Sequence, residues 1–170
     1  FPTLALTLTL AFTLALATGA RAQPLPARAG LVVRFGDGRV LTRCVDLPEG
    51  GLTGLELLQR SGLGLTIQVQ GLGALVCRIE QEGCPSADDC LCQCHSMGAG
   101  CRYWAYHSLG LEGWHYEQVG PTARRLGDGD VDGWAWGAGS ISDGAAPPLM
   151  TFAQVCAAAA PTAVPSATAG

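Results

Sequence analysis

Two groups of side chains in this chain have the types and spacing that chemistry needs. The first is the cysteine-rich segment GCPSADDCLCQCHSMGAGCR at residues 83–102. Thiolates with a neighbouring histidine are common zinc ligands, and Cys90, Cys94 and His95 form a stretched version of the haem-attachment spacing. The alternative is a loop crosslinked by structural disulfides, and we favour it because an exported protein meets an oxidising compartment.

The second group is the acidic turn Asp128-Gly-Asp130-Val-Asp132-Gly133, which matches the start of a calcium loop. Gly139 stands where that loop needs its bidentate glutamate. We therefore predict a polar turn that leads into the strand of Trp134 and Trp136, and no metal site. Neither G-x-S-x-G nor H-E-x-x-H occurs, so we expect a non-catalytic protein.

Export is predicted from the N-terminal residues. Residues 1–22 form an apolar run that ends in Ala20-Arg21-Ala22, the pattern of a cleaved signal peptide; a membrane anchor is the alternative. Residues 23–29 form a leader and residues 30–156 the folded domain. Residues 157–170 form a Pro/Ala/Thr-rich linker or stalk, with a membrane tether expected beyond it. We expect the protein to be secreted or held at the cell surface.

The charge and the cysteine count limit the function further. The chain has no lysine and a net charge of −4, which argues against a nucleic-acid partner. Its eight cysteines all follow the predicted signal, and an even count after such a signal predicts disulfides. The disulfide candidates are Cys44, Cys77, Cys84, Cys90, Cys92, Cys94, Cys101 and Cys156.

The elements that position these residues begin with two hairpins and a helix. Asp37-Gly38 is a preferred two-residue hairpin turn, and this register pairs Leu31 with Cys44 and points Cys44 to the core. Thr53 and Glu56 have the capping-box spacing, which predicts a short helix at about residues 54–61.

A second hairpin follows at residues 65–80, with Cys77 pointing inward. We therefore predict that Cys44 pairs with Cys77, and that Cys156 bonds back to the body of the domain. The order of elements indicates an α+β fold, a mixed sheet with one packed helix, stabilised by disulfides.

Most of the aromatic residues lie between Tyr103 and Gly137. Strand alternation sends Tyr103, Ala105 and His107 to one face and Trp104 and Tyr106 to the other. One set should complete the core under the helix. We expect the other set, with Trp104 and Tyr106 as the best candidates, to form a surface for a flat amphipathic ligand or another protein.

Three short motifs resemble the C-terminal β-domain of transcobalamin and intrinsic factor, in its bacterial secreted version. They are Gly54-Leu-Glu-Leu-Leu58 after Thr53, Tyr103-Trp104, and Gly127-Asp-Gly-Asp130 before the last strand. The resemblance covers about residues 30–140 and implies a β-grasp-like domain at residues 30–156. In those vitamin B12 carriers the Tyr-Trp strand borders the corrinoid. This implies ligand-binding roles for Tyr103, Trp104, Ala105, Tyr106 and His107.

The resemblance implies an exported ligand-binding domain, with cobalamin or a related corrinoid as ligand and His107 or His115 as a cobalt ligand. The carriers clamp their ligand against a helical domain that has no match here, so binding by this domain should be weak. One alternative is a protein-interaction or accessory module of a cell-surface transport system, with a membrane transporter component as partner. Another is an extracytoplasmic metal-binding protein built on the cysteine segment.

Overall fold

The computed structural model describes residues 26–71, 73–94 and 100–157, so the predicted signal peptide, His95 and most of the C-terminal linker lie outside the described residues. No helix within those ranges is long and apolar enough to cross a membrane. The elements in chain order are β1 Arg28–Arg34, β2 Val40–Asp46, β3 Leu52–Thr53, α1 Gly54–Arg60, β4 Leu65–Gln70, β5 Gly73–Ile79, β6 Glu82–Gly83, β7 Arg102–Gly110, β8 Gly113–Tyr116, β9 Arg125–Leu126, β10 Val131–Ala138 and α2 Phe152–Val155.

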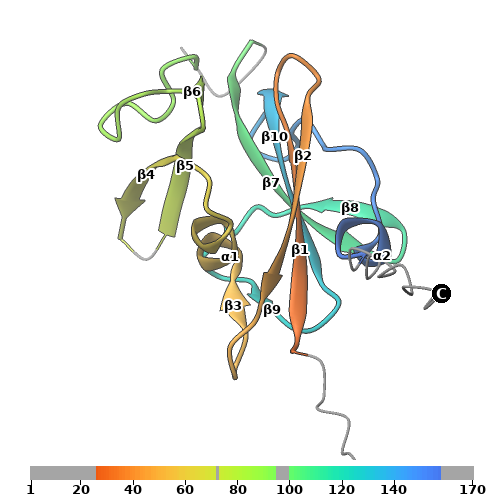
Figure 1. The fold of residues 1–170 in the computed structure, drawn as a ribbon. Coiled ribbons are helices and arrows are strands. Elements are labelled where there is room, and N and C mark those ends of the chain that lie inside the picture. Colours follow the sequence, from red (N-terminus) through yellow and green to blue (C-terminus); the bar gives the residue numbers. More distant parts are fainter. Residues whose placement is uncertain (1–25, 72, 95–99, 158–170) are drawn as a thin grey trace, which may run out of the picture.

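The main sheet has five strands in the order β2-β1-β10-β7-β8. In this sheet β1 and β10 are parallel to each other. The other pairs of neighbouring strands, β2 with β1, β10 with β7 and β7 with β8, are antiparallel, so the sheet is mixed. A second sheet, β4-β5-β6, stands beside it with α1 between the two (Figure 1). The α+β class predicted from the order of elements is confirmed.

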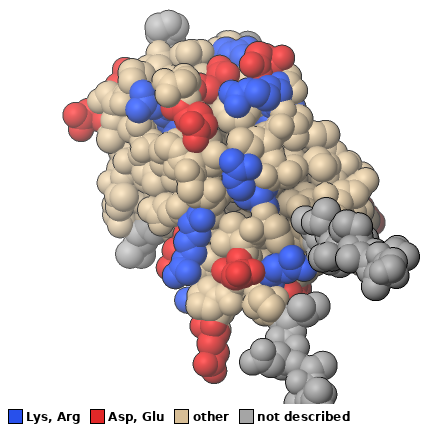
Figure 2. Space-filling view, viewed as in Figure 1, with Lys and Arg blue, Asp and Glu red and all other residues tan. Residues whose placement is uncertain are grey.

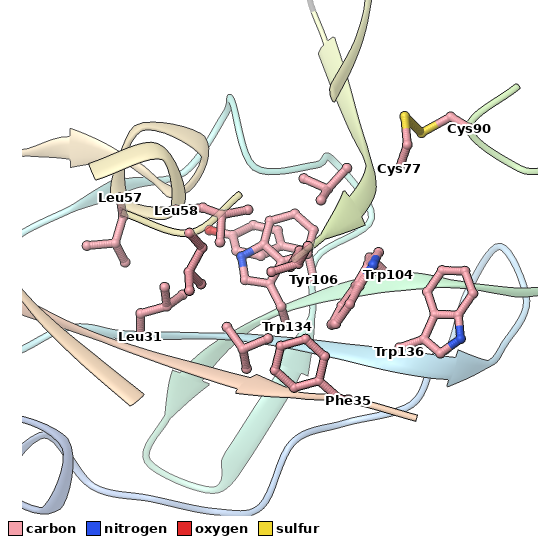
Figure 3. Packing of buried hydrophobic residues seen from close by; sticks show 14 of the residues in the cluster. Leu31, Phe35, Leu57, Leu58, Cys77, Cys90, Trp104, Tyr106, Trp134 and Trp136 are labelled. Carbon is pink, nitrogen blue, oxygen red and sulfur yellow. A yellow bond between two sulfur atoms is a disulfide. The ribbon is translucent and has the colours of Figure 1, made fainter. Parts of the chain in front are cut away.

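The core lies between the inner face of the main sheet and a cover made by α1 and β5. Leu57 and Leu58 of α1 are fully buried, in one cluster with Leu31 of β1 and with Phe35, which directly follows β1 (Figure 3). Leu55 of the same helix is only partly buried, at the margin of the core.

The start of α1 has the predicted capping box. The Thr53 hydroxyl accepts a hydrogen bond from the Glu56 backbone N–H at 3.2 Å, and the Glu56 carboxylate accepts one from the Thr53 N–H at 2.7 Å. The helix ends at Arg60, with Ser61 as C-cap and Gly62 next in the left-handed region at φ 77°. Glycine is common at this position because it adopts a positive φ without strain.

Replacing Thr53 with alanine is expected to lower the free energy of unfolding by about 1 kcal/mol, because one helix N–H loses its acceptor. The loss is measurable by urea denaturation followed by circular dichroism. Thr66→Ala on β4 removes the same atoms without touching a cap and serves as the control. An equal loss in both variants would contradict the capping role.

The first hairpin forms, but its predicted register is wrong by one residue. Gly38 N–H donates to the Phe35 carbonyl at 3.0 Å and Phe35 N–H donates to the Arg39 carbonyl at 2.9 Å, so the loop has three residues rather than two. Gly38, at φ 88°, takes the left-handed position such a loop requires. The shift turns every side chain of β2 to the opposite face, and Cys44 pairs with Gly30 across the strands.

This register explains why the predicted Cys44–Cys77 disulfide is wrong. Cys44 faces the outside of the sheet and bonds to Cys156 at the end of α2, while Cys77 bonds to Cys90 of the cysteine-rich segment. The other pairs are Cys84–Cys92 and Cys94–Cys101. The predictions that Cys156 returns to the body of the domain and that the segment is crosslinked are confirmed.

Candidate functional site

Trp104 and Tyr106, the predicted recognition residues, lie in the core. Each is 4% exposed. Trp104 packs edge-on against Phe35, with ring centroids 5.6 Å apart, and Tyr106 packs on Trp134 at 4.8 Å. The expectation of an exposed aromatic face is wrong, because this is the face that α1 and β5 cover (Figure 3).

The other set, Tyr103, Ala105 and His107, faces the outside of the sheet, but the chain after β10 covers it. The Tyr103 hydroxyl donates to the Ser140 carbonyl at 2.7 Å, and Gly144 lies against Ala105. His107 is 2% exposed and packs against the rings of Trp114 and Tyr116. Burial lowers the pKa of His107, which favours the neutral imidazole.

A buried hydrogen-bond network connects β7, β10 and the chain between β8 and β9. Asp132 is fully buried, and its carboxylate accepts hydrogen bonds from the Tyr106 hydroxyl and from Arg124 Nε, the latter at 3.0 Å. Burial raises the pKa of Asp132 to about 6, against the opposing effect of those two partners. Gly54 begins α1 directly above, where an added Cβ would lie 2.8 Å from Asp132 Oδ2, so α1 needs glycine there.

The remaining aspartates of the acidic turn also have protein partners. Asp128 Oδ1 accepts from the Arg28 N–H and Asp130 Oδ2 from the Gly127 N–H, both at 2.8 Å. These bonds hold the turn that leads into β10, as the sequence predicted. Among the described residues no group of His, Cys, Asp and Glu side chains is arranged to hold a metal ion.

All eight cysteines form disulfides within the described parts of the chain. The cysteine-rich segment therefore offers no thiolate to zinc, which was the basis of the metal-binding alternative. On the face shown in Figure 2, which includes β1 and β2, arginines alternate with acidic residues and form no patch of one sign.

A groove runs beside β7, and the pairing of the strands explains it. β8 pairs only with His107–Gly110, so no strand follows this edge of β7 over Tyr103–Tyr106. β5 forms the opposite wall with Ala74, Leu75 and Val76, and the chain from Tyr116 to Pro121 closes one side. This inner part of the groove has a volume of about 110 Å³.

The inner part opens into a wider outer part of about 290 Å³. The two share Ala74, Leu75, Gln118 and Gly120 as lining residues, so they form one continuous groove. Leu75 and Val119 stand at its mouth, 42% and 69% exposed. Glu117 is the only charged residue among those described that line it.

The groove contains some of the predicted site residues and leaves others out. Tyr103, Trp104 and Tyr106 line its inner part, whereas Ala105 and His107 do not. Sequence analysis missed Glu117, which comes from a loop with no motif. It also missed the network of Asp132, although Asp132 shares a strand face with Trp134 and Trp136, and a carboxylate on a core face requires a partner.

Together these features define a small, disulfide-rich α+β domain with an aromatic groove at the edge of its main sheet. Residues 96–166 match the family model described as the SCO2322-like domain. A proposed metal-binding protein from Ruminococcus gnavus ATCC 29149 shares 14% sequence identity with this chain, with a TM-score of 0.49, over 66% of this chain and 98% of that one. No curated protein sequence matches.

Proposed function

We propose that this protein is an exported, non-catalytic binding domain that takes a small amphipathic solute into the groove beside β7. The groove is the observation that carries the proposal, because ligand sites are concave and mostly apolar with a few polar groups. Aromatic and aliphatic side chains form its walls, and Glu117, Gln118 and Gln70 supply the polar groups. A concave site of this kind favours a small-molecule ligand, whereas a protein partner would favour a flat exposed patch.

Four disulfides support the exported location, since such bonds persist in oxidising compartments. The resemblance to the vitamin B12 carriers makes a corrinoid the first ligand to test. On the same resemblance we propose that the domain is related to the β-grasp fold. In this version Tyr103, Trp104 and Tyr106 contact the ligand through the groove wall. His107 takes no part, because it does not line the groove and is 2% exposed.

Titration with cobalamin, followed by the visible spectrum and by calorimetry, tests the corrinoid version. We expect saturable but weak binding, because one domain contacts only one side of the ligand. Leu75→Trp fills the mouth of the groove and is expected to weaken binding about tenfold, or 1.4 kcal/mol.

Leu111→Trp is the matched control, since Leu111 is fully exposed on the turn between β7 and β8, outside the groove. This variant should bind as the unmodified protein does. Absence of binding at high micromolar cobalamin, with the domain folded, would exclude a corrinoid. Equal weakening in both variants would place the ligand elsewhere.

A further inference from the structure

We propose that the groove selects a ligand bearing a positively charged organic group, such as a quaternary ammonium, held by Glu117 and the aromatic wall. This inference rests on the proposed function, because it assigns the ligand class of the same groove. It uses Glu117, the one carboxylate among the described residues that lines the groove.

Glu117 is a partly buried carboxylate without a counter-charge. Its N–H donates to the Tyr106 carbonyl at 2.9 Å and its Oε1 accepts the Ser108 hydroxyl at 2.5 Å, so the side chain is fixed in place. No arginine among the described residues forms an ion pair with it, whereas the buried Asp132 has Arg124. Because a carboxylate taken out of water is stabilised by a nearby cation, a cationic ligand would supply what the protein does not.

The aromatic wall offers rings rather than polar atoms. The Tyr106 hydroxyl donates to Asp132, the Tyr103 hydroxyl to the Ser140 carbonyl, and Trp104 Nε1 to the Glu82 carbonyl. The Tyr116 hydroxyl bonds to that of Tyr103 at 2.9 Å. With these polar atoms bonded within the protein, what the aromatic side chains offer a ligand is ring surface, which attracts a cation through the ring quadrupole.

The same wall gives an anion little to bind. No arginine lines either part of the groove within the described chain. Five aromatic residues line the inner part of the groove. Among the described residues, Trp134 Nε1 is the one indole N–H or hydroxyl of these five that has no hydrogen-bond partner. A phosphate or carboxylate would therefore meet the charge of Glu117 with no cation to offset it.

The size of the groove agrees with this ligand class. Its inner volume of about 110 Å³ equals that of roughly three to four water molecules at about 30 Å³ each, which suits a compact ammonium head. The outer part, beside Leu75 and Val119, can hold an apolar body.

Choline and its uncharged isostere 3,3-dimethylbutan-1-ol are the probes that isolate the charge. We expect calorimetry to show that choline binds the unmodified protein about tenfold more tightly than the isostere. Glu117→Gln keeps an acceptor for Ser108 but removes the charge, and should weaken choline binding about tenfold while leaving the isostere unchanged. Glu112→Gln makes the same change of net charge at an exposed turn and should have no effect.

A second variant covers the case in which Glu117→Gln does not fold. Gln118→Lys places an ammonium group of the protein in the groove and should prevent choline from binding. The cation inference would be overturned if choline still binds to whichever of the two variants folds, or if choline and the isostere bind equally well. Either result would leave the groove as a site that binds solutes. Failure of choline, the isostere and cobalamin alike would instead count against the proposed function.

Discussion

Replacing both Cys44 and Cys156 with serine is expected to lower the free energy of unfolding by about 4 to 5 kcal/mol. The disulfide joins residues 112 positions apart, and a crosslink that closes so long a loop removes much of the entropy of the unfolded chain. It also holds α2 against β1, where Val155 packs on Gly30. Urea denaturation of the oxidised variant, followed by tryptophan fluorescence, measures the loss.

Replacing Cys94 and Cys101 with serine is the matched control. That disulfide spans only 7 positions, for which the same relation gives about 2.5 kcal/mol. Each pair includes one nearly buried cysteine, Cys156 at 4% and Cys101 at 1% exposure, so the serines meet similar surroundings. Equal losses in the two variants would contradict an entropic effect that depends on loop length.

The second large effect concerns pH and the buried Asp132. The pKa of its carboxyl is about 6 in the folded protein, against an ordinary value of 3.8, because burial disfavours the charge. The folded state therefore holds this proton more tightly than the unfolded chain does. The resulting stabilisation is fully present below pH 3.8 and is lost as the pH rises through 6. At roughly 1.4 kcal/mol per pH unit, it changes by about 2 to 3 kcal/mol between pH 4 and pH 7.

The difference in unfolding free energy between the unmodified protein and Asp132→Asn, measured from pH 4 to pH 7, isolates this effect. We expect the difference to move in favour of the unmodified protein as the pH falls. Glu56→Gln should give a slope of the opposite sign, because hydrogen bonds from Thr53 lower the pKa of Glu56. Stabilisation by Glu56 is therefore present above its ordinary pKa of 4.5 and is lost as the pH falls. A flat difference for Asp132→Asn would show that burial does not govern its proton.

Local signals predicted the elements whose cause is local. Thr53 and Glu56 lie three residues apart, and in the capping box each side chain accepts a hydrogen bond from the backbone N–H of the other residue. Alternation in β4 and the glycines after it predicted the second hairpin, which forms with Cys77 buried. Capping and strand alternation act over a few residues, so the sequence of those residues is enough.

The first hairpin shows how a small local error spreads. Gly36-Asp37-Gly38 fits a two-residue turn at Asp37-Gly38 almost as well as the three-residue loop that forms. The choice between them reverses the two faces of β2. The burial of Leu41 and Val45 against the core and the bond between Cys44 and α2 hold the register, and both involve residues distant in the sequence.

The sequence by itself determined the α+β class, the capped helix, a crosslinked cysteine segment and a strand whose alternate residues are aromatic. Tertiary structure alone decided that both aromatic faces of β7 are covered, since α1 and β5 cover Trp104 and Tyr106 while the chain after β10 covers Tyr103 and Ala105. It also decided that β8 stops short of Tyr103–Tyr106 and leaves a groove with Glu117 in its wall. The physical reason is that burial and pairing depend on surfaces that meet only when distant segments pack together.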